Sequence, residues 1–164
     1  MDGKLRNMTS VYLRKGDKFL LLYRMGSRVV GNSYTGTAGG HFEESELNDA
    51  RACVLRELFE ETGLTEQDIE NFKFRYITLR LKNGEVRQNY YFFADLAEHV
   101  DAEKLCSNEG ELRWFAEDEM DTLNMPHSAK YMLLHYIKTG QYTDCLYGGI
   151  TTEEGVTFIE LKEF

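Results

Sequence analysis

Several segments of the chain alternate apolar and polar residues, or run apolar between turn residues, and both patterns predict β-strands. The expected strands cover residues 8–14, 18–24, 34–38, 69–81, 86–96, 112–115, 142–150 and 156–161. Lys15-Gly16-Asp17 joins the first two strands, and Asn83-Gly84 lies in the turn of a central pair. Asn-Gly between two such runs is the strongest short hairpin signal that a sequence offers.

Two other segments repeat apolar residues with the 3.6-residue period of an α-helix. The first covers residues 50–62, with Gly63 after it as a stop. Asn48 or Asp49 can cap its start. The second covers residues 126–139 and opens on a proline. Strands interleaved with two such helices indicate an α+β fold with a mixed β-sheet and a C-terminal β-hairpin.

The first of these helices has two distinct faces. Its apolar stripe consists of Val54, Leu55, Leu58, Phe59 and Thr62. Glu57, Glu60 and Glu61 stand at i, i+3 and i+4, so they share the opposite face. Like charges at this spacing destabilise an isolated helix by about 0.2–0.5 kcal/mol, and a sequence that keeps them usually places a cation there. Oxygen ligands alone suit Mg²⁺ or Mn²⁺, and a merely solvated acidic face is the alternative.

The composition is that of a globular chain with a strong negative charge. Hydrophobic residues make up 42% and charged residues 29% of its 164 residues, which excludes a disordered chain. We expect one domain over residues 1–164, with a core over about 5–140 and a C-terminal hairpin over 141–164. The net charge of −9 argues against a nucleic-acid polymer as partner. The negative charge does not exclude a single nucleotide as ligand, because metal ions can bridge an acidic protein to phosphate.

The three cysteines are odd in number and lack CxxC spacing. This usage suggests reduced thiols, without zinc or disulfides, in a cytoplasmic protein. The sequence shows neither a signal peptide nor an apolar run long enough for a bilayer, so we expect no membrane partner. Formation of a homodimer is left open.

One stretch of the chain carries a recognisable motif. Its residues are Gly40, Glu46, Arg56-Glu57-Leu58, Glu60-Glu61 and Gly63-Leu64. They resemble the Nudix box, the signature G-x5-E-x7-R-E-U-x-E-E-x-G-U of the Nudix hydrolase family, in which U is a bulky aliphatic residue. Residues 56–64 match every defined position, but nine residues separate Glu46 from Arg56 where the motif has seven. We interpret this as a two-residue insertion in the loop before the helix, where added length costs little stability.

The resemblance implies an α/β/α sandwich and a MutT-like nucleotide pyrophosphohydrolase that depends on Mg²⁺ or Mn²⁺. Such an enzyme would cleave a diphosphate bond in a nucleoside di- or triphosphate derivative. An (oxidised) purine deoxynucleoside triphosphate, hydrolysed to the monophosphate and pyrophosphate, is the first expectation. ADP-ribose, a nucleotide sugar and a dinucleoside polyphosphate are the alternatives among substrates. A catalytically silent Nudix protein that binds a nucleotide as a sensor is the alternative of another class.

The resemblance also implies roles for individual residues. The expected metal ligands are Gly40, Glu57, Glu60, Glu61 and Glu109. The three helical glutamates and Arg56 are the expected catalytic residues. Glu111 is the alternative to Glu109 as the later acid that assists in many members of this family.

Arg56 is expected to hold the loop rather than a metal ion. It would point away from the acidic face of its helix and pair with a loop carboxylate such as Glu43. Glu46 is either a metal ligand or a plain loop acid, and the insertion leaves its role and that of Glu43 open.

Substrate contacts are expected from Arg24 and Asn124. Arg24 ends a strand beside the loop, where it could hold a phosphate or be an ordinary strand-end charge. Asn124 precedes Met125-Pro126, a segment that resembles one in MutT-type enzymes whose Asn reads a purine edge. A plain helix cap is the alternative for Asn124. His41 is expected to be a loop residue with a backbone hydrogen bond, and Trp114 a core residue.

Overall fold

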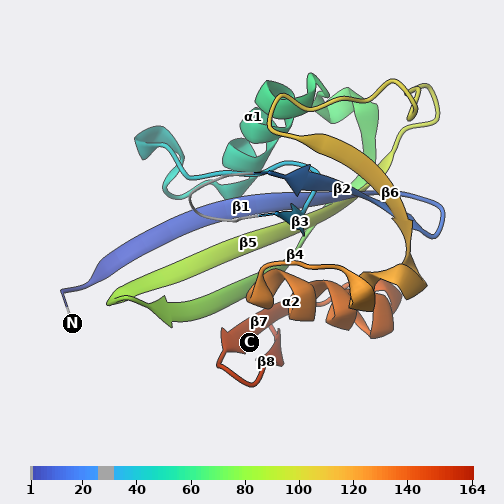
Figure 1. Ribbon diagram of the computed structural model, residues 1–164. Coiled ribbons are helices and arrows are strands. Elements are labelled where there is room, and N and C mark those ends of the chain that lie inside the picture. The colour runs from blue at the N-terminus through green and yellow to red at the C-terminus, as the bar shows by residue number, and fades with distance from the viewer. Residues whose placement is uncertain (1, 26–31) are drawn as a thin grey trace.

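The computed structural model describes residues 2–25 and 32–164, and a mixed β-sheet of eight strands in these ranges forms its centre (Figure 1). The strands are β1 (Lys4–Lys15), β2 (Lys18–Arg24), β3 (Ser33–Thr35), β4 (Ile69–Lys82), β5 (Glu85–Leu96), β6 (Glu111–Ala116), β7 (Leu146–Thr151) and β8 (Val156–Leu161). They follow the order β3-β2-β1-β5-β4-β7-β8, and β6 pairs with β2 outside this path.

The α-helices are α1 (Ala50–Thr62) and α2 (His127–Lys138). Short 3-10 helices lie at Glu44–Glu46, Glu66–Asp68, Glu117–Thr122 and Gly140–Tyr142. In the part of the chain that the structure describes, no helix is long and apolar enough to cross a membrane.

The two α-helices cover opposite faces of the sheet, with α1 above it and α2 below it in Figure 1. Alternation along β1 explains this arrangement, because Val11 and Leu13 pack toward α1 while Tyr12 packs toward α2. The α1-side core contains Val11, Leu13, Leu20, Val54, Leu58 and Phe92, and the α2-side core contains Tyr12, Phe19, Tyr76, Phe93, Met132 and Leu133. The expected α/β/α sandwich is therefore confirmed.

The hairpin turns form where the sequence predicts them. Gly16 adopts a φ of 63° between β1 and β2, which glycine reaches without steric cost. Asn83 and Gly84 have φ of 54° and 73°, as the two central residues of a tight hairpin turn require. This turn pairs β4 with β5 from Lys82 opposite Glu85 onward.

Three strand predictions differ from the structure at their edges. The strand expected over 8–14 begins earlier, at Lys4. The expected strand over 34–38 ends at Thr35, because the Thr37 hydroxyl bonds the backbones of both β1 and β2. Thr37 Oγ1 accepts from the Leu13 N–H at 3.0 Å and donates to the Leu20 carbonyl at 2.6 Å, so the chain crosses from β2 to β1 here. The expected strand over 142–150 begins only at Leu146, since the 3-10 helix Gly140–Tyr142 and the irregular residues 143–145 precede it.

Helix α1 has the predicted ends. The Asp49 side chain accepts a hydrogen bond from the Ala52 N–H at 2.9 Å and so caps the first turn. Gly63 ends the helix in the left-handed conformation at φ 75°, and its N–H donates to the Phe59 carbonyl at 2.8 Å.

The buried face of α1 differs from the predicted apolar stripe. Phe59 is 58% exposed, whereas Cys53 is fully buried with its Sγ 3.4 Å from the Thr9 hydroxyl of β1. Glu61 is only 8% exposed, because it pairs with Arg24 of β2. The prediction that all three glutamates lie opposite the core is therefore wrong for Glu61.

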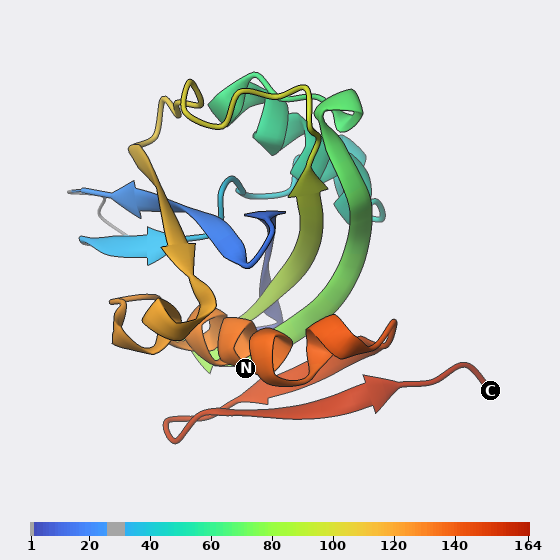
Figure 2. The same ribbon diagram turned by 90° about the vertical axis from the view of Figure 1, so that its right-hand side faces the viewer.

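The C-terminal hairpin β7–β8 extends the sheet beyond β4 and lies under α2 (Figure 2). The Tyr147 ring of β7 stacks on the Tyr76 ring of β4 with centroids 5.2 Å apart. His127 Nε2 lies 2.9 Å from the Thr152 carbonyl at the end of β7. The hairpin thus holds the first turn of α2 as well as the sheet edge.

Candidate active site

The segment 37–42 runs beside β1 and brings the two adjacent glycines close to α1. The Thr9 N–H donates to the Gly40 carbonyl at 2.8 Å, and other backbone bonds join residues 37, 38 and 42 to β1. A Cβ on Gly39 would lie 2.2 Å from the Thr9 carbonyl oxygen. A Cβ on Gly40 would lie 2.3 Å from Glu57 Oε1, so a side chain at this position would displace the Glu57 carboxylate.

Arg56 binds Glu46 through two parallel hydrogen bonds. Its Nε donates to Oε1 at 2.7 Å and its Nη2 to Oε2 at 2.9 Å. This bonding is the main reason that the pKa of Glu46 falls to about 2. Arg56 thus pairs with a carboxylate before the helix, as expected, but the partner is Glu46 and not Glu43, because the chain turns into the 3-10 helix Glu44–Glu46 and presents Glu46.

Arg56 also contacts the acidic face of its own helix. Its Nη1 donates to Glu57 Oε1 at 2.9 Å and to Glu60 Oε2 at 3.0 Å. The prediction that Arg56 points away from the glutamates is therefore wrong. The side chain bridges loop and helix, and its Nη2 further donates to the His41 carbonyl at 3.1 Å. His41 is accordingly a loop residue with a backbone hydrogen bond, as expected.

These contacts locate the two extra residues of the motif. Gly40 lies against Glu57 and Glu46 lies against Arg56, so the first half of the motif reaches the helix in spite of its added length. The additional residues are therefore accommodated between Glu46 and the start of α1, over the exposed residues 47–49.

Glu61 forms the buried end of the acidic face. Its Oε1 accepts from Arg24 Nη2 at 3.1 Å, while its buried Oε2 has no hydrogen-bond partner within residues 2–25 and 32–164. Burial is the largest cause that raises the pKa of Glu61 to about 7; Arg24 opposes the rise, and the charges of Glu57 and Glu109 add to it.

The loop before β6 brings the later acid to this group. Glu109 Oε2 lies 3.9 Å from Arg24 Nη2, on the guanidinium that also binds Glu61. Glu111 is instead held by Arg113, at 2.6 Å from Nη2. Of the two acids weighed from the sequence, Glu109 is thus the one beside the helical glutamates.

Asn108 makes a further contact in this site, and no sequence motif predicted its position. Its Nδ2 donates to the Glu60 carbonyl at 2.9 Å and its N–H to the Glu61 carbonyl at 3.2 Å. The loop is thereby tied to the last turn of α1, whose carbonyls have no partner within the helix.

The carboxylates fit a hard divalent cation in kind, although they do not enclose one. In residues 2–25 and 32–164, no group of three or more His, Cys, Asp or Glu side chains forms a candidate metal cage. Mg²⁺ in nucleotide sites binds one or two carboxylates and takes its other ligands from phosphate and water. The orphaned Oε2 of Glu61 and the neighbouring Glu57 are oxygen donors of this kind. The Gly40 carbonyl already accepts one backbone bond and keeps a second lone pair.

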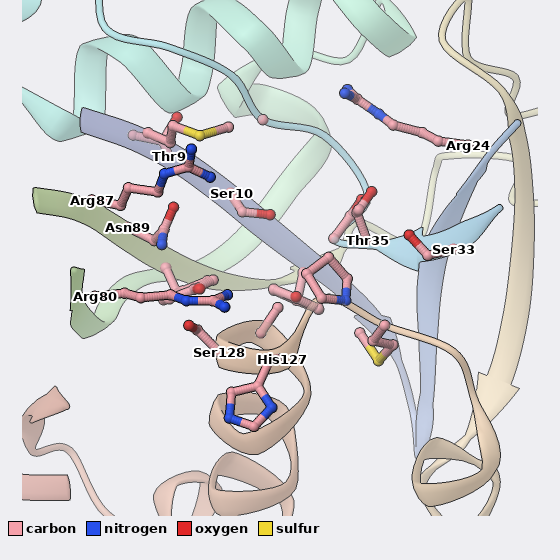
Figure 3. Close-up of a pocket in the computed structure, with 18 of the residues that line it drawn as sticks. Thr9, Ser10, Arg24, Ser33, Thr35, Arg80, Arg87, Asn89, His127 and Ser128 are labelled. Atoms are coloured by element: carbon pink, nitrogen blue, oxygen red, sulfur yellow. The ribbon is translucent and has the colours of Figure 1, made fainter. Parts of the chain in front are cut away.

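A cavity of about 410 Å³ opens beside the acidic face, between the sheet and the first turn of α2 (Figure 3). Arg24 lines this cavity and also binds Glu61, so one side chain connects the two sites. Asn124 lines it as well, and its Nδ2 donates to the Asn32 carbonyl at 2.9 Å. Among the described residues, the N-cap of α2 is Pro126 and no side-chain cap hydrogen bond is present, so Asn124 does not cap this helix.

Buried polar atoms without partners gather around this site. Among the described residues only four such side-chain atoms occur, and three belong to Arg24, Ser33 and Glu61. Arg24 and Ser33 line the cavity. Buried polar groups are nearly always hydrogen-bonded, so these atoms are available to bind a ligand or water. Ser33 has no sequence motif around it that could have indicated this position. Trp114, by contrast, packs against the α1-side core as expected.

The NUDIX domain family model matches residues 4–136 of the chain. Among solved structures, a mutator MutT protein from Bacillus halodurans has a TM-score of 0.65 at 24% identity, over 94% of this chain and 97% of that one. The Caenorhabditis elegans Ap4A hydrolase binary complex has a TM-score of 0.61 at 16% identity, over 85% and 99%. The E. coli ORF135 protein has a TM-score of 0.64 at 17% identity, over 85% and 94%.

No match is found among curated proteins. The likeness to solved structures at these identities shows the fold, and the family match extends over most of the chain. The chain therefore belongs to the Nudix family of hydrolases.

Proposed function

We propose that this Nudix protein is a Mg²⁺- or Mn²⁺-dependent hydrolase that cleaves a diphosphate bond in a nucleoside diphosphate derivative. The observation that carries the proposal is the continuity of the acidic face of α1 with the cavity. Arg24 lies at the junction, with Glu61 on one side and the cavity on the other. A phosphate chain at this junction would have cationic side chains on one side and carboxylates that can share a metal ion on the other.

The chain's own residues have separate tasks in this proposal. Glu57, Glu60 and Glu61, with the Gly40 carbonyl and Glu109, would hold the metal ion. Bound Mg²⁺ would neutralise the diphosphate and acidify a water molecule.

Arg56 would position Glu57 and Glu60, since its Nη1 contacts both. A glutamate of this group whose carboxylate does not bind the metal ion would accept the proton of the attacking water. Arg24 would orient a phosphate group of the substrate.

The fold alone does not determine the substrate, because specificity in such folds depends on the side chains of the pocket. The neighbours named above include a MutT protein and an Ap4A hydrolase, so purine nucleoside triphosphates and dinucleoside polyphosphates are the first compounds to assay. ADP-ribose and nucleotide sugars complete the panel.

The test is a panel of these nucleotides incubated with the protein in Mg²⁺ and in EDTA, with both products identified by ³¹P NMR. We expect cleavage within the phosphate chain of at least one compound in Mg²⁺ and none in EDTA. Binding without cleavage in Mg²⁺ would instead identify a silent nucleotide sensor, and cleavage at full rate in EDTA would contradict the metal dependence.

A further inference from the structure

The face of the sheet that α2 covers continues beyond the first turn of this helix, where its side chains are no longer aromatic. Under α2 the side chains are aromatic, with Tyr12 on β1, Tyr91 on β5 and Tyr76 on β4. Figure 1 shows that these three strands continue past the first turn of α2. Side chains two residues apart share a face. On β4 and β5 this face becomes polar and then basic, and on β1 Ser10 and Met8 precede the basic Arg6. The basic residues on it are Arg6, Arg80, Lys82 and Arg87.

The three arginines of this group form one row across the sheet. Arg6 of β1 is opposite Arg87 of β5 in the parallel pair, and Arg87 is opposite Arg80 of β4 in the antiparallel pair. Like charges directly opposite each other destabilise a sheet. Glu85 offsets part of this charge, at 3.4 Å from Arg6 Nε and 3.0 Å from Arg87 Nε. Within the described residues, Arg80 and Lys82 form no ion pair, so positive charge remains in excess.

The row faces the cavity and not the open surface. The side chains of Arg6 and Arg87 are 29% and 24% exposed. Figure 3 shows Arg80 and Arg87 reaching into the cavity from one side, and Arg24 standing at the other. Among the described residues that line the cavity, none is acidic, although the chain as a whole carries a net charge of −9. The cavity is therefore cationic at both ends, and Arg24 at one end is paired with Glu61 of α1.

We infer that the arginine row binds a second anionic group of the substrate, a phosphate monoester at the end remote from the diphosphate that is cleaved. The inference rests on the proposed function for the position of the diphosphate. A diphosphate beside Glu61 would neutralise the Arg24 end and leave the row unpaired. An uncharged base or sugar against the row would remove water from the guanidinium groups without replacing its hydrogen bonds, which is costly. Guanidinium forks match phosphate oxygens in geometry and charge.

The expected substrates are thus nucleotides phosphorylated on both sides of the nucleoside, and not simple nucleoside triphosphates. Three matched pairs differ by one such phosphate: AMP and adenosine 3′,5′-bisphosphate, ADP-ribose and its 2′-phosphate, and dephospho-coenzyme A and coenzyme A. Their binding is measured by titration calorimetry in EDTA and low salt, where the comparison requires no catalysis.

In at least one pair, the wild-type protein should bind the additional phosphate about tenfold more tightly or better, the range of a charge-assisted hydrogen bond. Arg80→Gln and Lys82→Gln should reduce this preference toward one, since neither side chain has an ion pair to lose. Lys138→Gln removes an equal charge from the exposed last turn of α2 and should keep the preference. Circular dichroism verifies that each variant is folded.

Equal affinity within all three pairs for the wild-type protein would overturn the inference, and so would a preference that Arg80→Gln and Lys82→Gln leave unchanged. Addition of Mg²⁺ separates this result from the proposed function. A binding preference without hydrolysis of any compound would support the phosphate site and contradict the enzyme, while hydrolysis without a preference would contradict the phosphate site alone.

Discussion

At the scale of single residues, Arg56 connects the loop to the acidic face of α1. One guanidinium holds Glu46 with Nε and Nη2 and touches Glu57 and Glu60 with Nη1. A substitution of Glu46 should therefore alter the positions of Glu57 and Glu60, although Glu46 itself does not contact them.

We expect Glu46→Gln to lower kcat by up to about 100-fold, because a shift of about 1 Å in a positioned group can cost that much in rate. Hydrogen exchange over residues 39–49 should become faster in the same variant. Glu43→Gln is the matched control and should keep both the rate and the protection. The opposite pattern, with Glu43→Gln impaired and Glu46→Gln normal, would show that Glu43, and not Glu46, is the acid that holds Arg56.

The ion pair between Arg56 and Glu46 predicts how the free energy of unfolding depends on pH. Arg56 lowers the pKa of Glu46 from 4.5 to about 2, so between these values the unfolded chain binds the proton more readily than the folded one. The stabilisation from this pair is complete above about pH 4.5 and is lost as the pH falls toward 2. Urea unfolding from pH 6 to pH 3 should show a smaller loss of stability in Glu46→Gln than in the wild-type protein. If the free energy of unfolding falls equally with pH in both proteins, the Arg56–Glu46 pair does not contribute to the loss of stability in acid.

The sequence could predict the acidic face but not the partner of Arg56. The spacing of Glu57, Glu60 and Glu61 alone places them on neighbouring turns of one helix. The choice between Glu43 and Glu46 depends on the path of the loop, which the 3-10 helix Glu44–Glu46 determines. Local spacing carries no information on that path when the motif contains added residues.

At the scale of secondary-structure elements, the last turn of α1 and the loop before β6 act as one unit. Asn108 joins them through the Glu60 and Glu61 carbonyls, and Glu109 follows directly in the chain. Two acids of the candidate site thus come from elements far apart in the sequence. The burial of Glu61 has the same kind of cause, since its partner Arg24 lies 37 residues away. The helical period predicts which residues share a face, but not which face the sheet will contact.

Asn108→Ala should lower the free energy of unfolding by about 0.5–1.5 kcal/mol, because it removes one side-chain hydrogen bond to the end of a helix. It should also reduce the hydrolysis rate, since Glu109 would lose its anchor. Asn48→Ala, at an exposed loop position, serves as the comparison for urea unfolding and rate. A rate unchanged by Asn108→Ala would mean that Glu109 does not need this loop geometry.

At the scale of the whole molecule, an acidic protein concentrates basic side chains in one cavity. The period-two positions of Arg80 and Lys82 are visible in the sequence, but their alignment with Arg6 and Arg87 is not. That alignment requires the register of β4 on β5, which the Asn-Gly turn specifies, and the parallel register of β1 on β5, which no local signal specifies.

Repulsion within the arginine row should be measurable without any ligand. In low salt and without phosphate, Arg80→Gln should melt at the same temperature as the wild-type protein or higher, because it relieves a like-charge contact. Added salt should narrow the difference by screening. Lys138→Gln removes a cation from the surface of an acidic protein and should not raise the melting temperature. A clear destabilisation by Arg80→Gln in low salt would show that this arginine is held by contacts within the protein.

The most direct measurement compares Glu61→Gln with the wild-type protein in saturating Mg²⁺, on the nucleotide that the wild-type protein cleaves best. Glu44→Gln, an exposed loop acid a short distance before α1, is the control. We expect Glu61→Gln to lower kcat by about 10²-fold or more while the fold is retained, and Glu44→Gln to leave it unchanged. Near-normal turnover of a folded Glu61→Gln protein would contradict the placement of the catalytic centre on the acidic face of α1.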